Sequence, residues 1–234
     1  MATETGPLLA SGRDGDIFEF GPGLVLRRAK SGRVIEREAQ IITYAREHGY
    51  PVPQIHDVLS GGTEIVMDRI DGPMMADEML RQPWKMPRYC RELADLHDRL
   101  HVIPAPEWLP DIGGDRLVHL DLHPLNVMMT ASGPIVIDWT NAARGDPLLD
   151  VGVTFMLLTC PRIPGSDLLN RVLRPIRGEL GRAFTKRYRG HDLDVQLVNA
   201  AALKSLDTNM SPDEVALIER AGTRAQARVN RSSR

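Results

Sequence analysis

Polar and apolar residues along the first 70 positions follow two different periods. Short runs that alternate, or that are mainly apolar between glycine and proline, predict β-strands, whereas apolar residues at helical spacing predict one helix. The predicted elements are strands at 17–20, 24–28, 55–59 and 64–67, with the helix at 33–48 between the second and third strands. Gly49 ends the helix, and the Gly21-Pro22-Gly23 and Gly61-Gly62 turns join the strand pairs. This part of the chain is predicted to be a small mixed lobe.

From residue 71 onward the apolar residues fall mainly at helical spacing. Tyr89, Leu93, Leu96 and Leu100 recur at spacings of four, three and four residues, which predicts an amphipathic core helix over 87–102. Further helices are predicted at 168–188, 195–206 and 212–227, and one more begins after Asp146, with Asp146 as its N-cap and Pro147 in its first position. The pattern therefore predicts an α+β chain with lobes at 1–70 and 71–234 and a hinge at 68–72.

A short hairpin pattern interrupts the helical part. Residues 127–130 and 135–137 read as two strands around a turn at 131–134. A tight hairpin brings its two ends together, so we expect the flanking Asn126 and Asp138 to lie side by side and to share one cation. Their oxygens suit Mg²⁺, which takes one or two protein oxygens and phosphate oxygens. With Asp121 beside an attacking hydroxyl, this is the layout of a kinase-type phosphoryl-transfer site.

The motifs around this hairpin resemble, in order and spacing, the signature of the aminoglycoside phosphotransferase family. The matching residues are His119, Asp121, His123, Pro124 and Asn126, then Ile137, Asp138 and Trp139, then Gly145, Asp146, Pro147 and Asp150. The resemblance runs from about residue 10 to residue 160 and is specific from 119 to 150. It implies a bilobal protein-kinase-like fold, with a small β-rich N-terminal lobe that holds one helix and a mainly helical C-terminal lobe. A nucleotide would bind between them, with Asn126 and Asp138 as Mg²⁺ ligands.

The same resemblance assigns roles to the loop before the hairpin. Asp121 would orient the acceptor hydroxyl and take its proton. His123 stands where protein kinases commonly have lysine, which favours a small-molecule acceptor. His119 would brace the loop by packing and hydrogen bonding. Asp150, at the start of a helix, would hydrogen-bond the loop.

Residues of the first lobe would bind the nucleotide. Side chains alternate along a strand, so Val25 and Arg27 share a face, where Val25 could contact the adenine and Arg27 the phosphates. Arginine replaces the usual lysine, but its planar fork also holds phosphate. Glu38 on the following helix is the natural partner of Arg27.

The segment after the last strand of this lobe resembles the hinge that contacts adenine. The Asp68 carbonyl and the Ile70 N–H would meet the adenine edge, and Met67 would limit the depth of the pocket. The resemblance thus implies ATP, with GTP not excluded, and Mg²⁺ as cofactors, and a small molecule with a hydroxyl group as the acceptor.

Other readings of the same residues remain open. His119, Asp121 and His123 could ligate the metal of a hydrolase, although this leaves Asn126 and Asp138 unexplained. Separately, the helical pair at 97 and 101 could bind metal, but His97 lies among core leucines and favours packing.

A catalytically inactive kinase-like protein that acts through partners is the alternative function. Arg27 and the weak Gly12-x-x-Gly15 motif allow it, whereas the intact Asp121, Asn126 and Asp138 weigh against it. A protein kinase is disfavoured by the histidine at 123 and by the absence of an activation segment between the hairpin and residue 146.

Composition narrows the class of partner. The chain has 234 residues, 42% of them apolar and 26% charged, and a net charge of −2, so we expect neither nucleic acid nor a membrane as partner. Cys90 and Cys160 fit no metal spacing, the N-terminus lacks a signal-peptide pattern, and the apolar segment 151–160 is too short to span a bilayer. We expect a cytoplasmic protein; the identity of its acceptor and its oligomeric state stay open.

Overall fold

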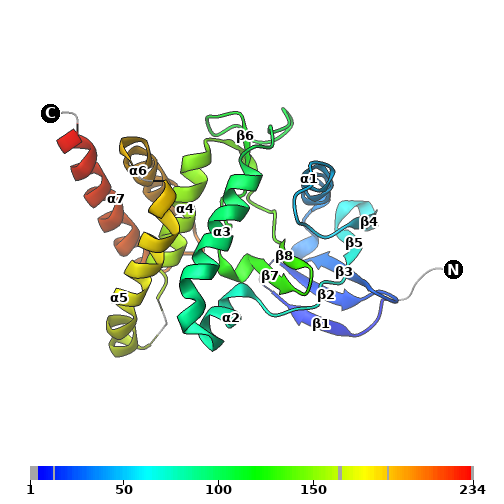
Figure 1. The fold of residues 1–234 in the computed structure, drawn as a ribbon. Coiled ribbons are helices and arrows are strands. Elements are labelled where there is room, and N and C mark those ends of the chain that lie inside the picture. The colour runs from blue at the N-terminus through cyan, green and yellow to red at the C-terminus, as the bar shows by residue number, and fades with distance from the viewer. Residues whose placement is uncertain (1–4, 13, 163–164, 189, 233–234) are drawn as a thin grey trace. The chain divides into compact units, whose positions relative to one another are not determined.

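The computed structural model describes residues 5–12, 14–162, 165–188 and 190–232 (Figure 1). They divide into two compact units. The first unit comprises the described residues up to Met75 together with Leu125–Thr140. The second comprises Ala76–Pro124 and the described residues from Asn141 on. The sequence predicts a boundary at residue 70, whereas here the later hairpin groups with the first unit.

The first unit is built on an antiparallel sheet with the strand order β1-β2-β3-β5-β4. Its elements are β1 (Leu8–Ser11), β2 (Gly15–Glu19), β3 (Leu24–Ala29), α1 (Glu36–Glu47), β4 (Ile55–Leu59) and β5 (Glu64–Asp68). The four predicted strands and the helix are confirmed, and α1 begins three residues later than predicted. Strand β1 was not predicted because its residues are all exposed and show no alternation.

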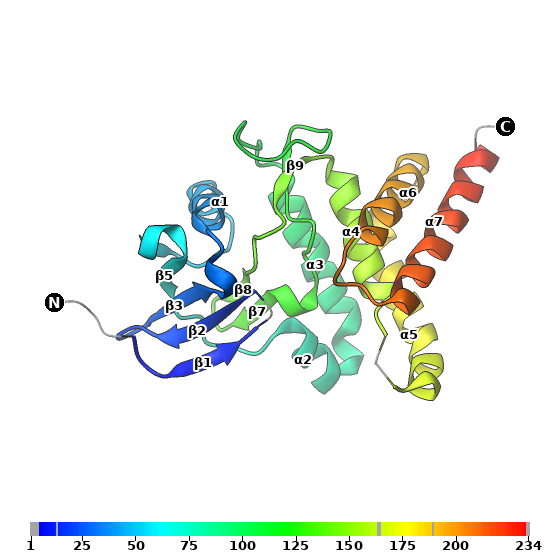
Figure 2. The same cartoon turned by 180° about the vertical axis from the view of Figure 1, so that it is seen from behind.

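The predicted hairpin is also present in the first unit, as β7 (Val127–Thr130) and β8 (Gly133–Val136). Figure 2 labels both strands of the hairpin. Two backbone hydrogen bonds of 2.8 Å join it to the earlier part of the unit, from the Val136 N–H to the Pro51 carbonyl and from the Met129 N–H to the Pro73 carbonyl. Just after the hairpin, the fully buried Trp139 meets Tyr50 edge to face, with ring centroids 5.6 Å apart. The hairpin is therefore an integral part of the first unit.

The second unit is mainly helical. Its elements are α2 (Met75–Arg81), α3 (Met86–Leu100), β6 (Arg116–Val118), β9 (Ala143–Gly145), α4 (Pro147–Thr159), α5 (Asp167–Phe184), α6 (His191–Ser205) and α7 (Pro212–Ser232). Strands β6 and β9 pair antiparallel. The mixed composition, with a five-stranded antiparallel sheet and a mostly helical C-terminal half, confirms the predicted α+β class. Helix α2 and strand β9 were not predicted because each is too short to show a period.

Helix α4 is the central helix of the second unit. It begins as predicted, because the Asp146 side chain accepts a hydrogen bond of 2.7 Å from the Leu148 N–H and Pro147 stands in the first turn. Its interior residues Val151 and Val153 are fully buried. A helix that is apolar on all sides must be covered by neighbours, and α5 and α6 pack against it.

Small residues let α6 approach its neighbours closely. A Cβ atom at Gly152 of α4 would lie 2.9 Å from the Cβ of Ala200, and one at Gly222 of α7 would lie 2.7 Å from the Cβ of Ala201. Glycine is therefore required at both helix contacts, which fix the position of α6. Among the described residues, no helix combines the length and the apolar composition needed to cross a membrane.

Candidate active site

The loop between β6 and the hairpin carries Asp121, whose carboxylate faces two basic side chains of the second unit. Its Oδ1 lies 3.4 Å from the Nζ of Lys204, and its Oδ2 lies 3.7 Å from the Nε2 of His123. The Lys204 ammonium also lies 3.0 Å from the Oδ2 of Asp207. Sequence reasoning did not identify Lys204 or Asp207, because a lysine in the last turn of a helix looks like an ordinary solvated cation.

The surroundings of Asp121 keep it ionised. Burial disfavours the charged form, but the hydrogen bond and charge of His123, followed by the charges of Lys204 and His119, outweigh it and hold the pKa of Asp121 well below its usual value. A carboxylate of such low basicity orients a hydroxyl better than it deprotonates one.

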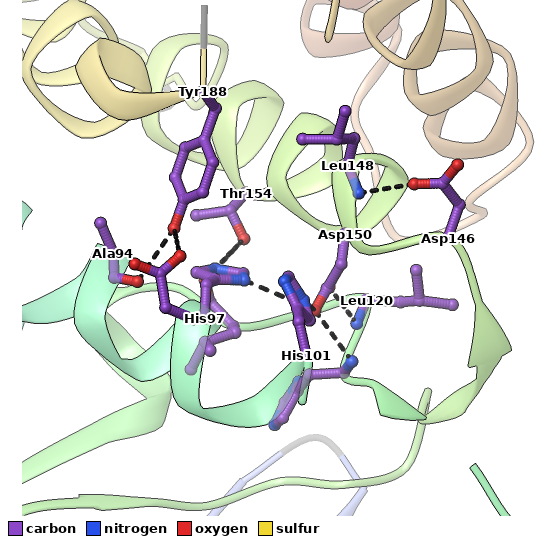
Figure 3. Close-up of polar contacts among 12 residues, drawn as sticks. Ala94, His97, His101, Leu120, Asp146, Leu148, Asp150, Thr154 and Tyr188 are labelled. Atoms are coloured by element: carbon purple, nitrogen blue, oxygen red, sulfur yellow. Dashed lines mark hydrogen bonds and ion pairs between the residues drawn. The ribbon is translucent and has the colours of Figure 1, made fainter. Parts of the chain in front are cut away.

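Asp150 binds the backbone of the loop that carries Asp121. Its Oδ1 accepts a hydrogen bond of 2.7 Å from the Leu120 N–H, and its Oδ2 accepts one of 3.1 Å from the His119 N–H (Figure 3). Leu120 has a φ of +60°, a conformation that non-glycine residues rarely adopt. The predicted hydrogen bonding of Asp150 to the loop is thus present, and it restrains the strained residue beside Asp121.

Two helices supply a buried polar network around Asp150. On α4, one turn after Asp150, the Thr154 hydroxyl donates to the Leu122 carbonyl at 2.8 Å. That hydroxyl has only one proton, so the His97 Nε2, 3.0 Å away, must donate to the Thr154 oxygen. From α3, His101 Nε2 and His97 Nδ1 lie 3.0 and 3.5 Å from the Asp150 Oδ2 (Figure 3).

This network explains the histidine pair on α3. His97 is fully buried, as its place among leucines predicts, and burial lowers its pKa. The ligand atoms of His97, His101 and Asp150 lie within 4.8 Å of one another, which keeps the metal-site reading geometrically open. Burial opposes the ionisation of Asp150, but the hydrogen bonds and charges of the two histidines prevail and lower its pKa well below the usual value. Because Asp150 already accepts hydrogen bonds from His101 and from two N–H groups of the loop, and the His97 Nε2 bonds Thr154, we interpret the network as a clamp on the loop.

In the first unit, Arg27 on β3 and Glu38 on α1 form the predicted ion pair. Glu38 is buried, and its Oε2 also accepts a hydrogen bond of 3.3 Å from the Thr140 hydroxyl. Burial raises the pKa of Glu38, the charge of Arg27 lowers it, and the charge of Asp138 raises it. Asp138 therefore lies close enough to act on the ion pair. Val25 is buried on the same strand face as Arg27.

The hairpin brings the backbone segments of Asn126 and Asp138 together at its base. The Ile137 N–H donates to the Asn126 carbonyl at 3.0 Å, which closes the base of the hairpin. Asn126 is buried, and Asp138 has a φ of +61°. Their common location agrees with the prediction, and their sharing of a cation stays a prediction.

The segment after β5 is fixed to its neighbours by Asp68. The Asp68 carboxylate lies 2.8 Å from the His56 Nε2 and accepts a hydrogen bond of 3.2 Å from the Gln54 N–H. Met67, paired with Val25 across the strands, is half-buried. The adenine contacts expected of the Asp68 carbonyl and the Ile70 N–H stay predictions.

The predicted site residues fall into two groups. Asp121 and His123 belong to the second unit, with Lys204, whereas the other candidates belong to the first unit. Those of the first unit are Val25, Arg27, Glu38, Met67, Asp68, Ile70, Asn126 and Asp138. Each group is assembled within its own unit, and the joining of the two groups around one nucleotide stays a prediction.

Comparison with known proteins places the chain among phosphotransferases. The profile of the phosphotransferase enzyme family matches residues 5–116 and 109–189. A search of curated proteins found no match.

Solved structures share the fold. A thermostable mutant of aminoglycoside phosphotransferase APH(4)-Ia, in a ternary complex with AMP-PNP and hygromycin B, is 17% identical with a TM-score of 0.63, over 96% of this chain and 92% of that one. The gentamicin-APH(2")-IIa complex is 16% identical with a TM-score of 0.62, over 95% and 89%. A choline/ethanolamine kinase family protein from Mesorhizobium loti is 17% identical with a TM-score of 0.59, over 95% and 88%. These likenesses confirm the predicted fold.

Proposed function

This chain belongs to the phosphotransferase enzyme family, and on that premise we propose that it transfers the γ-phosphoryl group of ATP to a hydroxyl of a small molecule, with Mg²⁺ as cofactor. The observation that carries the proposal is the clamped loop with an ionised Asp121. Asp121 stands five residues before Asn126 in the sequence, and Asn126 and Asp138 flank the two ends of the hairpin that follows.

In the proposed reaction the acceptor hydroxyl donates a hydrogen bond to the Asp121 carboxylate. Its oxygen attacks the γ-phosphorus as the bond from that phosphorus to the bridging oxygen of ADP breaks. The hydroxyl proton passes to Asp121 late in the step. A loose transition state needs little deprotonation beforehand, which agrees with the low basicity of Asp121.

The residues at the hairpin base fit a hard divalent cation. Asn126 offers an amide oxygen and Asp138 a carboxylate, the ligand types that Mg²⁺ takes together with phosphate oxygens. When bound, Mg²⁺ would neutralise negative charge on the triphosphate. Neighbouring structures hold AMP-PNP, ADP or Ca²⁺, which supports a nucleotide and a divalent ion here too. ATP is proposed over GTP by this analogy.

The proposed acceptor is a small hydroxylated molecule. Structural neighbours include complexes with hygromycin B and gentamicin, which supports an acceptor of this size. His123 beside Asp121, in place of a lysine, agrees with that class.

The proposal is tested with the full chain, ATP, Mg²⁺ and a panel of antibiotics, sugars, amino alcohols and nucleosides. We expect ADP release that depends on the acceptor, a new phosphoester signal in ³¹P NMR, and loss of both with EDTA. Nucleotide binding without phosphoester for any acceptor would favour the inactive kinase-like alternative. Absence of nucleotide binding would contradict both readings.

Replacing Arg27 by methionine is expected to raise KM for ATP about 10- to 100-fold, the effect of losing a charged hydrogen bond of about 1.5–3 kcal/mol. The Arg27→Lys variant should recover part of the loss because it keeps the charge. The matched control is Arg28→Met, since Arg28 lies next on the same strand, is half-buried and pairs with Glu64 instead. An equal KM in Arg27→Met and Arg28→Met would remove Arg27 from the nucleotide site. Initial rates at saturating acceptor measure these values.

A further inference from the structure

Lys204 is a buried cation in direct contact with the candidate catalytic carboxylate. We propose that Lys204 is a positioning residue for phosphoryl transfer, which holds Asp121 in the orientation that receives the acceptor hydroxyl. The contact between Lys204 and Asp121 is given by the geometry alone. Its consequence for catalysis rests on the proposed function.

The burial of Lys204 requires an explanation. Its side chain is only 7% exposed, whereas lysine is almost never buried unless it is paired. Its Nζ lies 3.0 Å from the Asp207 Oδ2 and 3.4 Å from the Asp121 Oδ1. The Asp207 contact is local, between residues three apart, and would form on the helix end without the loop. The Asp121 contact joins two residues that are 83 positions apart in the sequence, so it forms only when α6 packs in the folded protein.

The packing of α6 aims Lys204 at the loop. Ala200 lies one turn before Lys204 on the same face of the helix and packs against Gly152 of α4. Helix α4 also carries Asp150, which binds the backbone N–H groups of the two residues before Asp121. One helix therefore sets the position of both the loop and the lysine.

The charges around Asp121 indicate what the lysine does. Three basic groups face or act on the carboxylate, namely His119, His123 and Lys204, and Asp207 opposes them. Lys204 occupies the Oδ1 side and His123 lies nearer Oδ2. A carboxylate held on one oxygen by a fixed ammonium cannot rotate freely, and misplacement of a reacting group by about 1 Å can cost roughly 10²-fold in rate.

Kinetics of charge-removing and charge-keeping variants test the proposal. Lys204→Met should lower kcat by about 10²-fold with KM for ATP unchanged. Lys204→Arg, which keeps the charge, should recover much of the rate. Lys186→Met is the matched control, because Lys186 is an exposed lysine of the same unit, and it should behave as the wild type.

A second readout needs no turnover. Loss of the ammonium removes stabilisation of the ionised form, so the ¹³C NMR titration midpoint of the Asp121 carboxyl should rise in Lys204→Met, with the signal assigned by Asp121→Asn. This measurement tests the contact between Lys204 and Asp121 even if no acceptor is phosphorylated. Failure of the positioning proposal can therefore be distinguished from failure of the proposed function.

Several outcomes would overturn the inference. One is a folded Lys204→Met variant with the wild-type kcat. Another is a kcat above that of the wild type, which would mean that the lysine slows the reaction. The third is an unchanged titration midpoint of Asp121. If Lys204→Met does not fold, Lys204→Gln, which keeps a hydrogen-bond donor without the charge, takes its place under the same criteria.

Discussion

Asp121→Asn is expected to lower kcat by about 10²- to 10⁴-fold, the contribution typical of a positioned acid–base group. Asparagine keeps the shape of the side chain but cannot take the acceptor proton. Nucleotide affinity should stay unchanged, because the nucleotide candidates belong to the first unit and Asp121 belongs to the second. Steady-state turnover together with calorimetric titration of a non-hydrolysable ATP analogue measures both quantities.

The control for this variant is Asp115→Asn, which changes an exposed aspartate of the same unit and should leave kcat intact. Thermal unfolding of both variants checks that their folds are equivalent. Retention of most of the turnover by Asp121→Asn would remove Asp121 from the catalytic role.

Asp150→Ala is expected to reduce the free energy of unfolding by about 3–5 kcal/mol, the usual result of breaking a buried charged network by removing one partner. The variant leaves the His119 and Leu120 N–H groups without their carboxylate acceptor and removes the partner of two histidines. The strained Leu120 then loses its restraint, so kcat should fall as well. Urea unfolding followed by circular dichroism measures the change.

The same carboxylate predicts the pH dependence of stability. The pKa of Asp150 is lowered in the folded state, so its contribution is complete above the ordinary aspartate value of 3.8 and is lost as the pH falls toward the folded-state pKa. The difference in stability between wild type and Asp150→Ala should therefore shrink in acid. Asp95→Asn is the control, because Asp95 is exposed and its surface ion pair with Arg187 should matter by less than about 1 kcal/mol. An Asp150→Ala variant as stable as this control would contradict the clamp.

Features encoded by neighbouring residues were predictable from the sequence. The hairpin, the N-cap at Asp146 and the four strands of the first unit each depend on residues a few positions apart, where period and turn chemistry act directly. The pairing of Arg27 with Glu38 was also predictable, because a strand and the next helix of a known layout bring them together.

Features that depend on packing between residues far apart in the sequence were not predictable. Lys204 reaches Asp121 only because Gly152 and Ala200 let α6 approach α4 closely. No sequence motif around position 204 indicates this contact. Thr154 looks like an ordinary helix residue until its hydroxyl is seen to bind the Leu122 carbonyl. The grouping of residues 125–140 with the first unit was missed because backbone hydrogen bonds to Pro51 and Pro73 leave no trace in side-chain patterns.

That grouping also bears on the order in which the chain can mature during synthesis. The first unit lacks the hairpin and the Trp139 ring until position 140 has left the ribosome, by which time α2 and α3 of the second unit have already emerged. A nascent chain that ends at residue 75 would lack Trp139 and would leave the face of Tyr50 that packs against its indole ring uncovered. Neither unit is therefore a contiguous stretch of polypeptide, and the first unit can complete its fold only after α3 has been synthesised.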